Sequence, residues 1–238
     1  MPDFGFPFQG NPPSRAEWVL GQRFRFSEER WLSALPDPAL WPKELAALLP
    51  TADGLRHIDR RTVFQIASSA VDSAGAGHAL VAAMVWGTGT AARERARRLR
   101  VFQNAADKTC DRLANAINIL RADGAVAAYD CLHGRSSNIR YLGPSFGTKF
   151  LYFCGYDSSP GAFRPLILDR YVSAALNRLC GLEWPDSGFS VSQYAQYLEL
   201  AHTWASAWSA SPDVIERVLF SVGQAPGLAV ASLSGRTH

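Results

Sequence analysis

Long apolar runs are missing from this chain of 238 residues. The longest stretches, such as residues 79–86, fall far short of the ~20 residues that a membrane span needs. The chain opens with Met-Pro-Asp-Phe-Gly-Phe, which has neither the basic start nor the apolar centre of a secretory signal. Disorder is excluded as well, because 47% of the residues are apolar and only 19% are charged. We therefore expect a soluble, globular, cytoplasmic protein with no membrane partner.

Paired cysteines are absent and lysines are scarce. The four cysteines lie more than 20 residues apart and form no CxxC motif, whereas the ligands of zinc ribbons and iron–sulfur clusters usually lie within a few residues of one another. We expect no metal site and no iron–sulfur cluster. Lysine occurs only at Lys43, Lys108 and Lys149, so a lysine in a special position is informative. The net charge of +3 by itself says little about partners.

Alternating strand patterns are nearly absent apart from Arg23–Phe26, and helical periodicity dominates after residue 55. The sequence predicts a mainly α fold of two helical lobes with little or no sheet. We expect an N-terminal extension over residues 1–55 that packs on the core, a helical core over 56–223 and a C-terminal tail over 224–238. Helices are predicted over residues 27–35, 41–49, 63–71, 78–86, 91–102, 108–121, 125–132, 136–141, 148–154, 166–180, 190–208 and 211–223.

The stretch Gly143-Pro144-Ser145-Phe146-Gly147 predicts a tight turn between two of these helices, so that a helix–hairpin–helix lies at about residues 136–155. Backbone N–H groups at the start of the second helix, together with the helix dipole, would bind a phosphate oxygen, directly or through a monovalent cation. Glycine permits the close approach that such binding needs. A turn of this composition with no ligand is the simpler interpretation.

Lys149 lies two residues after this turn, and Asp169 begins a further predicted helix about twenty residues later. The stretches Gly143–Lys149 (Gly-Pro-Ser-Phe-Gly-Thr-Lys) and Leu168–Val172 (Leu-Asp-Arg-Tyr-Val) resemble the signature of the helix–hairpin–helix (HhH-GPD) DNA glycosylase superfamily. That signature reads Leu-Pro-Gly-Val-Gly-x-Lys and then Val-Asp-x-His-Val. Ser145 replaces the usual first hairpin glycine, and Tyr171 replaces the usual histidine. A looser likeness over about residues 60–222 is to bacterial relatives of 8-oxoguanine DNA glycosylase.

The resemblance implies a DNA glycosylase that flips a damaged base out of the duplex and cleaves its N-glycosidic bond, leaving an abasic site. Lys149 is then the amine nucleophile and Asp169 the carboxylate that stabilises positive charge on the sugar. A Schiff base on Lys149 would permit β-elimination, that is, an abasic-site lyase activity. The family's default substrate is 8-oxoguanine in double-stranded DNA, its role is DNA repair, and the protein is expected to be a monomer. The alternative for this pair is a half-buried ion pair between helices.

DNA contacts are predicted around the hairpin and on an arginine-rich helix, whose basic stripe would follow the phosphates. A solvated charged face is the alternative for that helix. The predicted contacts are Gly143, Ser145, Gly147, Thr148, Arg135, Arg140, Arg170, Arg93 and Arg97.

A base pocket or wedge is predicted from a loop and from aromatic residues. Thr88 lies in the loop 87–90, where the family has its wedge, and Phe153 lies four residues beyond the lysine, where 8-oxoguanine enzymes have a cysteine. Tyr197, His202 and Trp204 lie in a late aromatic-rich helix. Ordinary core packing is the alternative for each of these aromatic residues.

Two other functions remain open. Within the same class, the chain would be an anti-phage glycosylase that excises a hypermodified cytosine, such as glucosylated hydroxymethylcytosine, from viral DNA. In a different class, it would be a non-catalytic helix–hairpin–helix module that binds DNA without cleaving it. DNA binding alone needs neither Lys149 nor Asp169, and this favours the enzyme.

Overall fold

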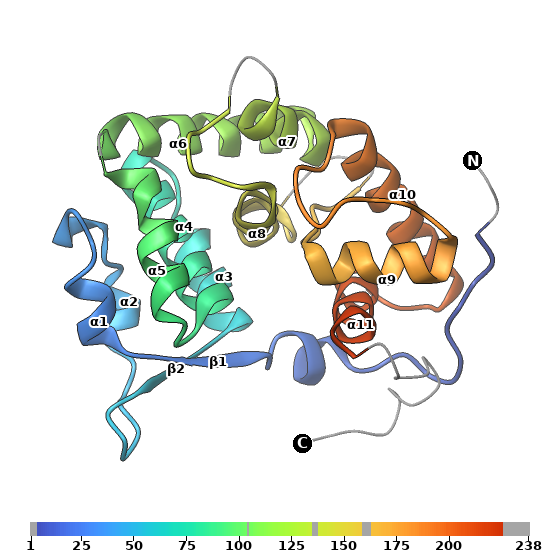
Figure 1. The fold of residues 1–238 in the computed structure, drawn as a ribbon, viewed down its shortest axis with the longest axis horizontal. Coiled ribbons are helices and arrows are strands. Elements are labelled where there is room, and N and C mark those ends of the chain that lie inside the picture. The colour runs from blue at the N-terminus through green and yellow to red at the C-terminus, as the bar shows by residue number, and fades with distance from the viewer. Residues whose placement is uncertain (1–3, 104, 135–137, 159–162, 226–238) are drawn as a thin grey trace.

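The predicted mainly α architecture is confirmed in the computed structural model, which describes residues 4–103, 105–134, 138–158 and 163–225 (Figure 1). The helices of the first half are α1 (Glu28–Leu32), α2 (Lys43–Ala46), α3 (Arg60–Ser68), α4 (Ser73–Thr88), α5 (Ala92–Leu99) and α6 (Ala106–Asp123). The second half contains α7 (Ala125–His133), α8 (Pro144–Gly155), α9 (Arg170–Cys180), α10 (Val191–Ala207) and α11 (Pro212–Gln224). Shorter helical turns are η1 (Arg15–Val19), η2 (Pro38–Leu40) and η3 (Arg100–Phe102).

A two-stranded antiparallel sheet joins the N-terminal part of the chain to the first helices. The predicted strand β1 (Arg23–Phe26) pairs with β2 (Arg56–Asp59), and Phe24 lies opposite Ile58. Strand β2 was not predicted from the sequence. Its last residue, Asp59, caps α3 through a bond from the Thr62 N–H to the Asp59 carboxylate of 2.8 Å, so the strand ends where the helix begins.

Capping residues set the ends of the later helices as the sequence predicts. Ser190 forms a capping box with Gln193 at the start of α10. Ser211 precedes Pro212 at the start of α11, and Asp213 lies in its first turn, where a negative charge is favourable.

Several predicted helices differ in their bounds from those found; the helix expected over residues 78–86, for example, begins at Ser73. Three further differences lie near Lys149 and Asp169. The helix expected over residues 136–141 is absent where the chain is described, because Asn138 to Leu142 form a turn and residues 135–137 lie outside the described part. The helix expected from residue 148 begins four residues earlier, at Pro144, so the predicted tight turn is the first turn of α8. The helix expected from residue 166 begins at Arg170, because Leu166 to Leu168 have no regular secondary structure and Asp169 is the N-cap.

Helix α8 lies in the centre of the molecule, and every residue from Phe146 to Gly155 is buried (Figure 1). It packs against α3, α4, α6 and α7. Two glycines permit the close packing: a Cβ atom at Gly147 would collide with the imidazole of His133, and one at Gly155 would collide with the side chain of Leu120. The apolar character of α8 follows from this position, since a helix that is covered on all sides has no polar face.

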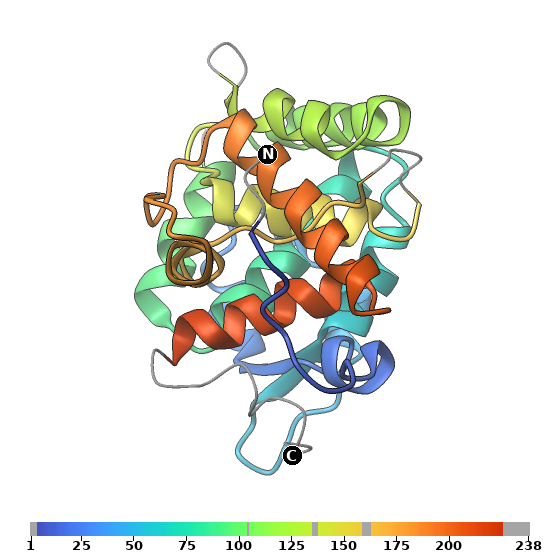
Figure 2. The ribbon, with the colours of Figure 1, turned by 90° about the vertical axis from the view of Figure 1, so that its right-hand side faces the viewer.

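The N-terminal segment crosses the face formed by α10 and α11 (Figure 2). The Phe8 ring stacks on Trp208 with 5.0 Å between centroids. The indole N–H groups of Trp204 and Trp208 donate to the backbone carbonyls of Phe4 and Gly10, at 3.3 and 2.7 Å. Residues from opposite ends of the chain therefore pack together.

A buried ion pair links α3 to α11. Arg60 Nη1 lies 2.6 Å from Glu216 Oε2, and both side chains are 1% exposed. The guanidinium of Arg60 also lies over the rings of Trp86 and Tyr152, and its Nε donates to Gln22 Oε1 at 2.9 Å. Burial raises the pKa of Glu216, and the charge of Arg60 opposes that shift.

None of the helices in the described part of the chain is long and apolar enough to cross a membrane.

Replacing Arg60 by Met should lower the free energy of unfolding by about 3–5 kcal/mol, because it leaves the buried Glu216 carboxylate without its counter-ion. A carboxyl group whose folded pKa exceeds its unfolded value stabilises the fold at low pH and loses that contribution as pH rises, so the loss should be larger at about pH 8 than at about pH 5. Urea unfolding at the two pH values measures both effects. The double variant Arg60→Met/Glu216→Leu should lack the pH dependence; if it keeps that dependence, the unpaired carboxylate is not its cause.

Candidate active site

A lysine and an aspartate meet where α8 begins. Lys149 Nζ lies 3.1 Å from Asp169 Oδ2, and the two residues are 5% and 7% exposed. The amine also lies 3.1 Å from Ser145 Oγ, one turn earlier on α8, and 5.2 Å from the centroid of the Phe146 ring. The amine thus lies within hydrogen-bond reach of both a carboxylate and a hydroxyl, an arrangement that can serve covalent catalysis.

Asp169 is held by the start of α9. Its Oδ1 accepts the backbone N–H groups of Tyr171 and Val172, at 3.0 and 3.3 Å, while Oδ2 contacts Lys149. One carboxylate oxygen therefore fixes the side chain to the helix terminus, and the other is directed at the amine. Tyr171 supplies only its backbone to this cap, so the replacement of the family's usual histidine leaves the cap intact.

The backbone of Leu166 to Leu168, just before Asp169, is hydrogen-bonded by side chains from both α8 and α10. Thr148 Oγ1 accepts the Leu168 N–H at 3.1 Å and lies 3.2 Å from the Leu168 carbonyl oxygen. From α10, the hydroxyl groups of Tyr194 and Tyr197 donate to the carbonyls of Leu166 and Ile167, at 3.1 and 3.0 Å. Because buried backbone groups need partners, these bonds determine where Asp169 lies relative to Lys149.

The end of α4 forms a further wall of the site. A Cβ atom at Gly87 would lie 3.1 Å from Cδ and Cε of Lys149 and 3.0 Å from a Phe146 ring carbon, so the lysine stem passes directly over this glycine. Thr88, a predicted wedge residue, is the next residue along the chain. Its buried hydroxyl has no hydrogen-bond partner among the described residues.

Arginines surround this end of α8. The Arg98 guanidinium on α5 lies over the Phe146 ring at 4.4 Å. Arg100 and Arg140 both lie over the ring of Tyr141, at 4.2 and 4.8 Å. Tyr141 itself has a positive φ of 69° in the loop before α8. An anion approaching the start of α8 would therefore meet several positive charges.

Comparison with known proteins gives one match. A protein-family model described as "Putative 8-oxoguanine DNA glycosylase OGG-like protein" matches residues 17–220, a span that contains Lys149, Asp169 and all helices from α1 to α10. The chain belongs to this OGG-like glycosylase family. No curated protein and no solved structure matches the chain.

The predicted DNA contacts of this OGG-like chain fall into two groups. Arg97, Arg140 and Arg170 are exposed, and Gly143 is the N-cap of α8. Ser145, Gly147 and Thr148 instead face the protein, toward Lys149, His133 and Leu168. Arg135 and the side chain of Arg93 lie outside the described residues.

The aromatic residues predicted for the base pocket are all engaged within the protein. Phe153 packs edge-on against Phe64 and Trp86, with centroids 5.1 and 5.4 Å apart. His202 Nε2 accepts the Arg164 N–H at 2.9 Å, and Trp204 lies beneath the N-terminal segment. Together with the bond from Tyr197 to Ile167, these contacts place the four side chains in the core or against other segments of the chain.

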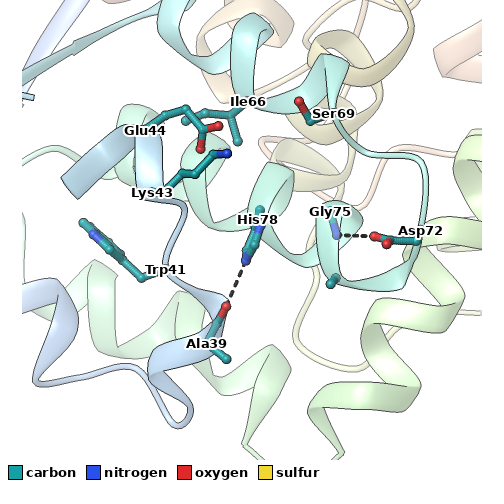
Figure 3. Close-up of a pocket in the computed structure, with 10 residues that line it drawn as sticks. Ala39, Trp41, Lys43, Glu44, Ile66, Ser69, Asp72, Gly75 and His78 are labelled. Atoms are coloured by element: carbon teal, nitrogen blue, oxygen red, sulfur yellow. Dashed lines mark hydrogen bonds between the residues drawn. The ribbon is translucent and has the colours of Figure 1, made fainter. Parts of the chain in front are cut away.

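Two cavities lie outside the predicted residues. The first, of about 410 Å3, lies at the N-terminal end of α4 beside Trp41, Lys43 and His78, whose Nε2 lies 2.8 Å from the Ala39 carbonyl oxygen (Figure 3). It is roughly 18 Å along α4 from Gly87, since twelve residues at about 1.5 Å separate Gly75 from Gly87. The second, of about 450 Å3, lies between β1 and α11, and the residues that line it include Trp18, Gln22, Arg217 and Phe220.

Thr148→Val should weaken both the fold and the active site, because valine has the same shape but leaves the buried Leu168 N–H without an acceptor. We expect a loss of about 1–3 kcal/mol in the free energy of unfolding, together with a loss of activity that exceeds the fraction unfolded. Thr148→Ser, which keeps the hydroxyl, is the control and should recover most of both. Chemical denaturation and turnover at a temperature where the variants are folded measure the two effects. Equal activity of the valine and serine variants would show that Thr148 does not position Asp169.

Proposed function

We propose that this OGG-like protein excises a damaged or modified base from double-stranded DNA, with Lys149 as nucleophile and Asp169 as the essential carboxylate. The observation that carries the proposal is the distance of 3.1 Å between Lys149 Nζ and Asp169 Oδ2 at a buried helix terminus. Taking two charges out of water is costly, and a purely structural link between α8 and α9 could be made by apolar side chains.

Lys149 and Asp169 together account for cleavage of the N-glycosidic bond. The bond between C1′ of the sugar and the base nitrogen breaks, and its electron pair leaves with the base, which takes up a proton. The carboxylate of Asp169 stabilises the positive charge that develops at C1′. Asp169 carries a proton from the Lys149 ammonium to the departing base, and the neutral amine then bonds to C1′.

A second step is open to the covalent intermediate. Opening of the sugar ring gives a Schiff base between C1′ and Lys149 Nζ. Loss of a C2′ proton then breaks the bond from C3′ to oxygen and nicks the strand, which is an abasic-site lyase reaction. Attack by water on the Schiff base releases the sugar and regenerates the amine.

The start of α8 and the arginines around it would bind the DNA duplex. Backbone groups after Gly143 and the positive end of the α8 dipole would hold a phosphate, directly or through a monovalent cation. Arg97, Arg140 and Arg170 are exposed and would contact further phosphates. We propose that one chain acts alone on the duplex, because Lys149 and Asp169 come from the same chain.

The family match supports an 8-oxoguanine-like base as the substrate. A glucosylated hydroxymethylcytosine, whose removal would serve defence against viral DNA, is the alternative within the same chemistry. The cavity of about 450 Å3 between β1 and α11 lies within the usual range for ligand pockets and would admit a base with a substituent.

Borohydride should trap a covalent adduct between the protein and DNA, because it reduces the Schiff base on Lys149 to a stable amine. Duplexes that carry 8-oxoguanine, uracil, an abasic site, or hydroxymethylcytosine with and without glucose are compared by denaturing gel electrophoresis. Lys149→Ala should abolish the adduct on every duplex. Lys108→Ala, which removes an exposed lysine on α6, is the matched control and should leave it unchanged.

Asp169→Asn should abolish release of the free base while leaving binding to undamaged duplex within about twofold, since the amide keeps the size of the side chain but cannot stabilise positive charge. Base release is measured by chromatography and binding by fluorescence anisotropy. Retained base release by this variant would disprove the assigned role of Asp169. Binding without release or an adduct on any duplex, by the unsubstituted protein, would indicate a non-catalytic DNA-binding module.

A further inference from the structure

The ammonium group of Lys149 has one nearby hydrogen-bond acceptor for each of its three N–H groups. Asp169 Oδ2 and Ser145 Oγ each lie 3.1 Å from Nζ, and the carbonyl oxygen of Ser145 lies 3.4 Å from it. Two of these acceptors therefore belong to Ser145, which lies one turn before Lys149 on α8. The third is the carboxylate that the proposed reaction uses.

The aliphatic part of the Lys149 side chain is confined by its neighbours. Its Cδ and Cε atoms pass over Gly87, where a Cβ atom would lie 3.1 Å from both, and Nζ lies 5.2 Å from the centroid of the Phe146 ring. These contacts fix the path of the side chain, but they leave rotation about the bond between Cε and Nζ free. The hydrogen bonds of Nζ determine that rotation.

The rotation of the amine decides where its electron pair points once a proton has left. In the proposed reaction that proton passes to Asp169, so the electron pair takes the direction of the N–H bond that pointed at Oδ2. The two remaining N–H groups stay on the hydroxyl and the carbonyl oxygen of Ser145. Because Asp169 stabilises the charge at C1′, the sugar must lie on this same side of the amine. Ser145 therefore directs the electron pair toward the atom that it attacks.

We propose that Ser145 positions Lys149 for attack on C1′ and thereby decides whether the amine or water captures the sugar after the base has left. This inference rests on the proposed glycosylase function, since it requires a base to be released beside Asp169. Capture by the amine forms the bond between C1′ and Nζ, and the Schiff base that follows permits strand cleavage. Capture by water forms a bond between C1′ and oxygen, releases a proton to solvent and leaves an abasic site in an uncut strand.

Ser145 is a positioning residue, because it acts through Lys149 and not on the bond to the base. That bond breaks before C1′ is captured, and Asp169 stabilises the charge that develops. The carboxylate is held by the backbone N–H groups of Tyr171 and Val172, at 3.0 and 3.3 Å, and loss of the Ser145 hydroxyl leaves these bonds in place. Release of the base and formation of the covalent adduct should therefore respond differently to a change at Ser145.

Ser145→Ala should form the borohydride-trapped adduct about 10- to 100-fold more slowly than the unsubstituted protein, on duplexes that carry 8-oxoguanine or an abasic site. This range corresponds to loss of one hydrogen bond to a charged group. Release of 8-oxoguanine should fall by less than about threefold, since the Asp169 carboxylate is unchanged, and most product strands should break only after treatment with alkali.

Two further variants complete the comparison. Ser145→Thr keeps the hydroxyl and should retain most of the adduct. Ser192→Ala removes an exposed hydroxyl from the second residue of α10, as Ser145→Ala removes one from the second residue of α8, and it should change neither product. Adduct and free base are measured in portions of one reaction, so the fraction of folded protein cancels from their ratio.

An equal fall of adduct and free base in Ser145→Ala would overturn the proposal, because Ser145 would then support the fold or the whole site. So would unchanged adduct formation in Ser145→Ala, or an adduct as weak in Ser145→Thr as in Ser145→Ala. Base release without any adduct by the unsubstituted protein would overturn the role of Ser145 and leave base excision standing. Absence of both products would show that the proposed function itself has failed.

Discussion

The contact between Lys149 Nζ and Asp169 Oδ2 is the interaction on which the arrangement of the surrounding helices depends. Two opposite charges in a site that is more than nine-tenths buried are maintained only if the chain holds both precisely enough to offset their lost hydration. Helix α8 is buried on all sides and fixes the amine, and the N-cap of α9 fixes the carboxylate. The side-chain hydroxyl of Thr148 on α8 then bonds to the backbone of Leu168, which directly precedes Asp169, so a short buried side chain links the helix of the amine to the segment of the carboxylate.

The elements with strong local signals could be predicted from the sequence, and those that depend on distant partners could not. The start of α11 follows from Ser-Pro-Asp, and α10 starts at the predicted capping serine. The apolar residues Leu166 to Leu168 fit a helix equally well by pattern. They lie outside any helix because Thr148, Tyr194 and Tyr197 satisfy their backbone groups, and these partners are 20 to 30 residues away in the chain. The position of β2 likewise depends on pairing with β1 and not on its own four residues.

In the candidate site, too, residues with a local sequence signal were predictable and residues that depend on distant partners were not. The proximity of Lys149 and Asp169 was predictable because the motif that they resemble places these residue types at a fixed spacing along two adjacent helices. The aromatic residues of α10 were predicted to line a base pocket, but Tyr197, His202 and Trp204 bond to backbone groups of neighbouring segments. The cavity between β1 and α11 is instead lined by residues of η1, β1 and α11, and its Trp18 and Arg217 are about two hundred residues apart, so a local sequence pattern does not bring them together. Ser145 is instructive, since a substitution that weakens the hairpin signature supplies an oxygen 3.1 Å from the reactive amine.

The candidate site offers a chemical reason for the small number of lysines in the chain. A glycosylase needs positive charge to hold phosphates and one amine to attack the sugar, and these two requirements conflict if lysines provide both. An arginine remains charged and is not a nucleophile at neutral pH, so it can surround the DNA without competing for C1′. Arg98, Arg100 and Arg140 lie around the start of α8, and Lys149 is the amine beneath them. Lys43 on α2 and Lys108 on α6 lie in other parts of the molecule, so Lys149 is the lysine that the fold buries beside a carboxylate, with its Nζ 3.1 Å from both Asp169 Oδ2 and Ser145 Oγ.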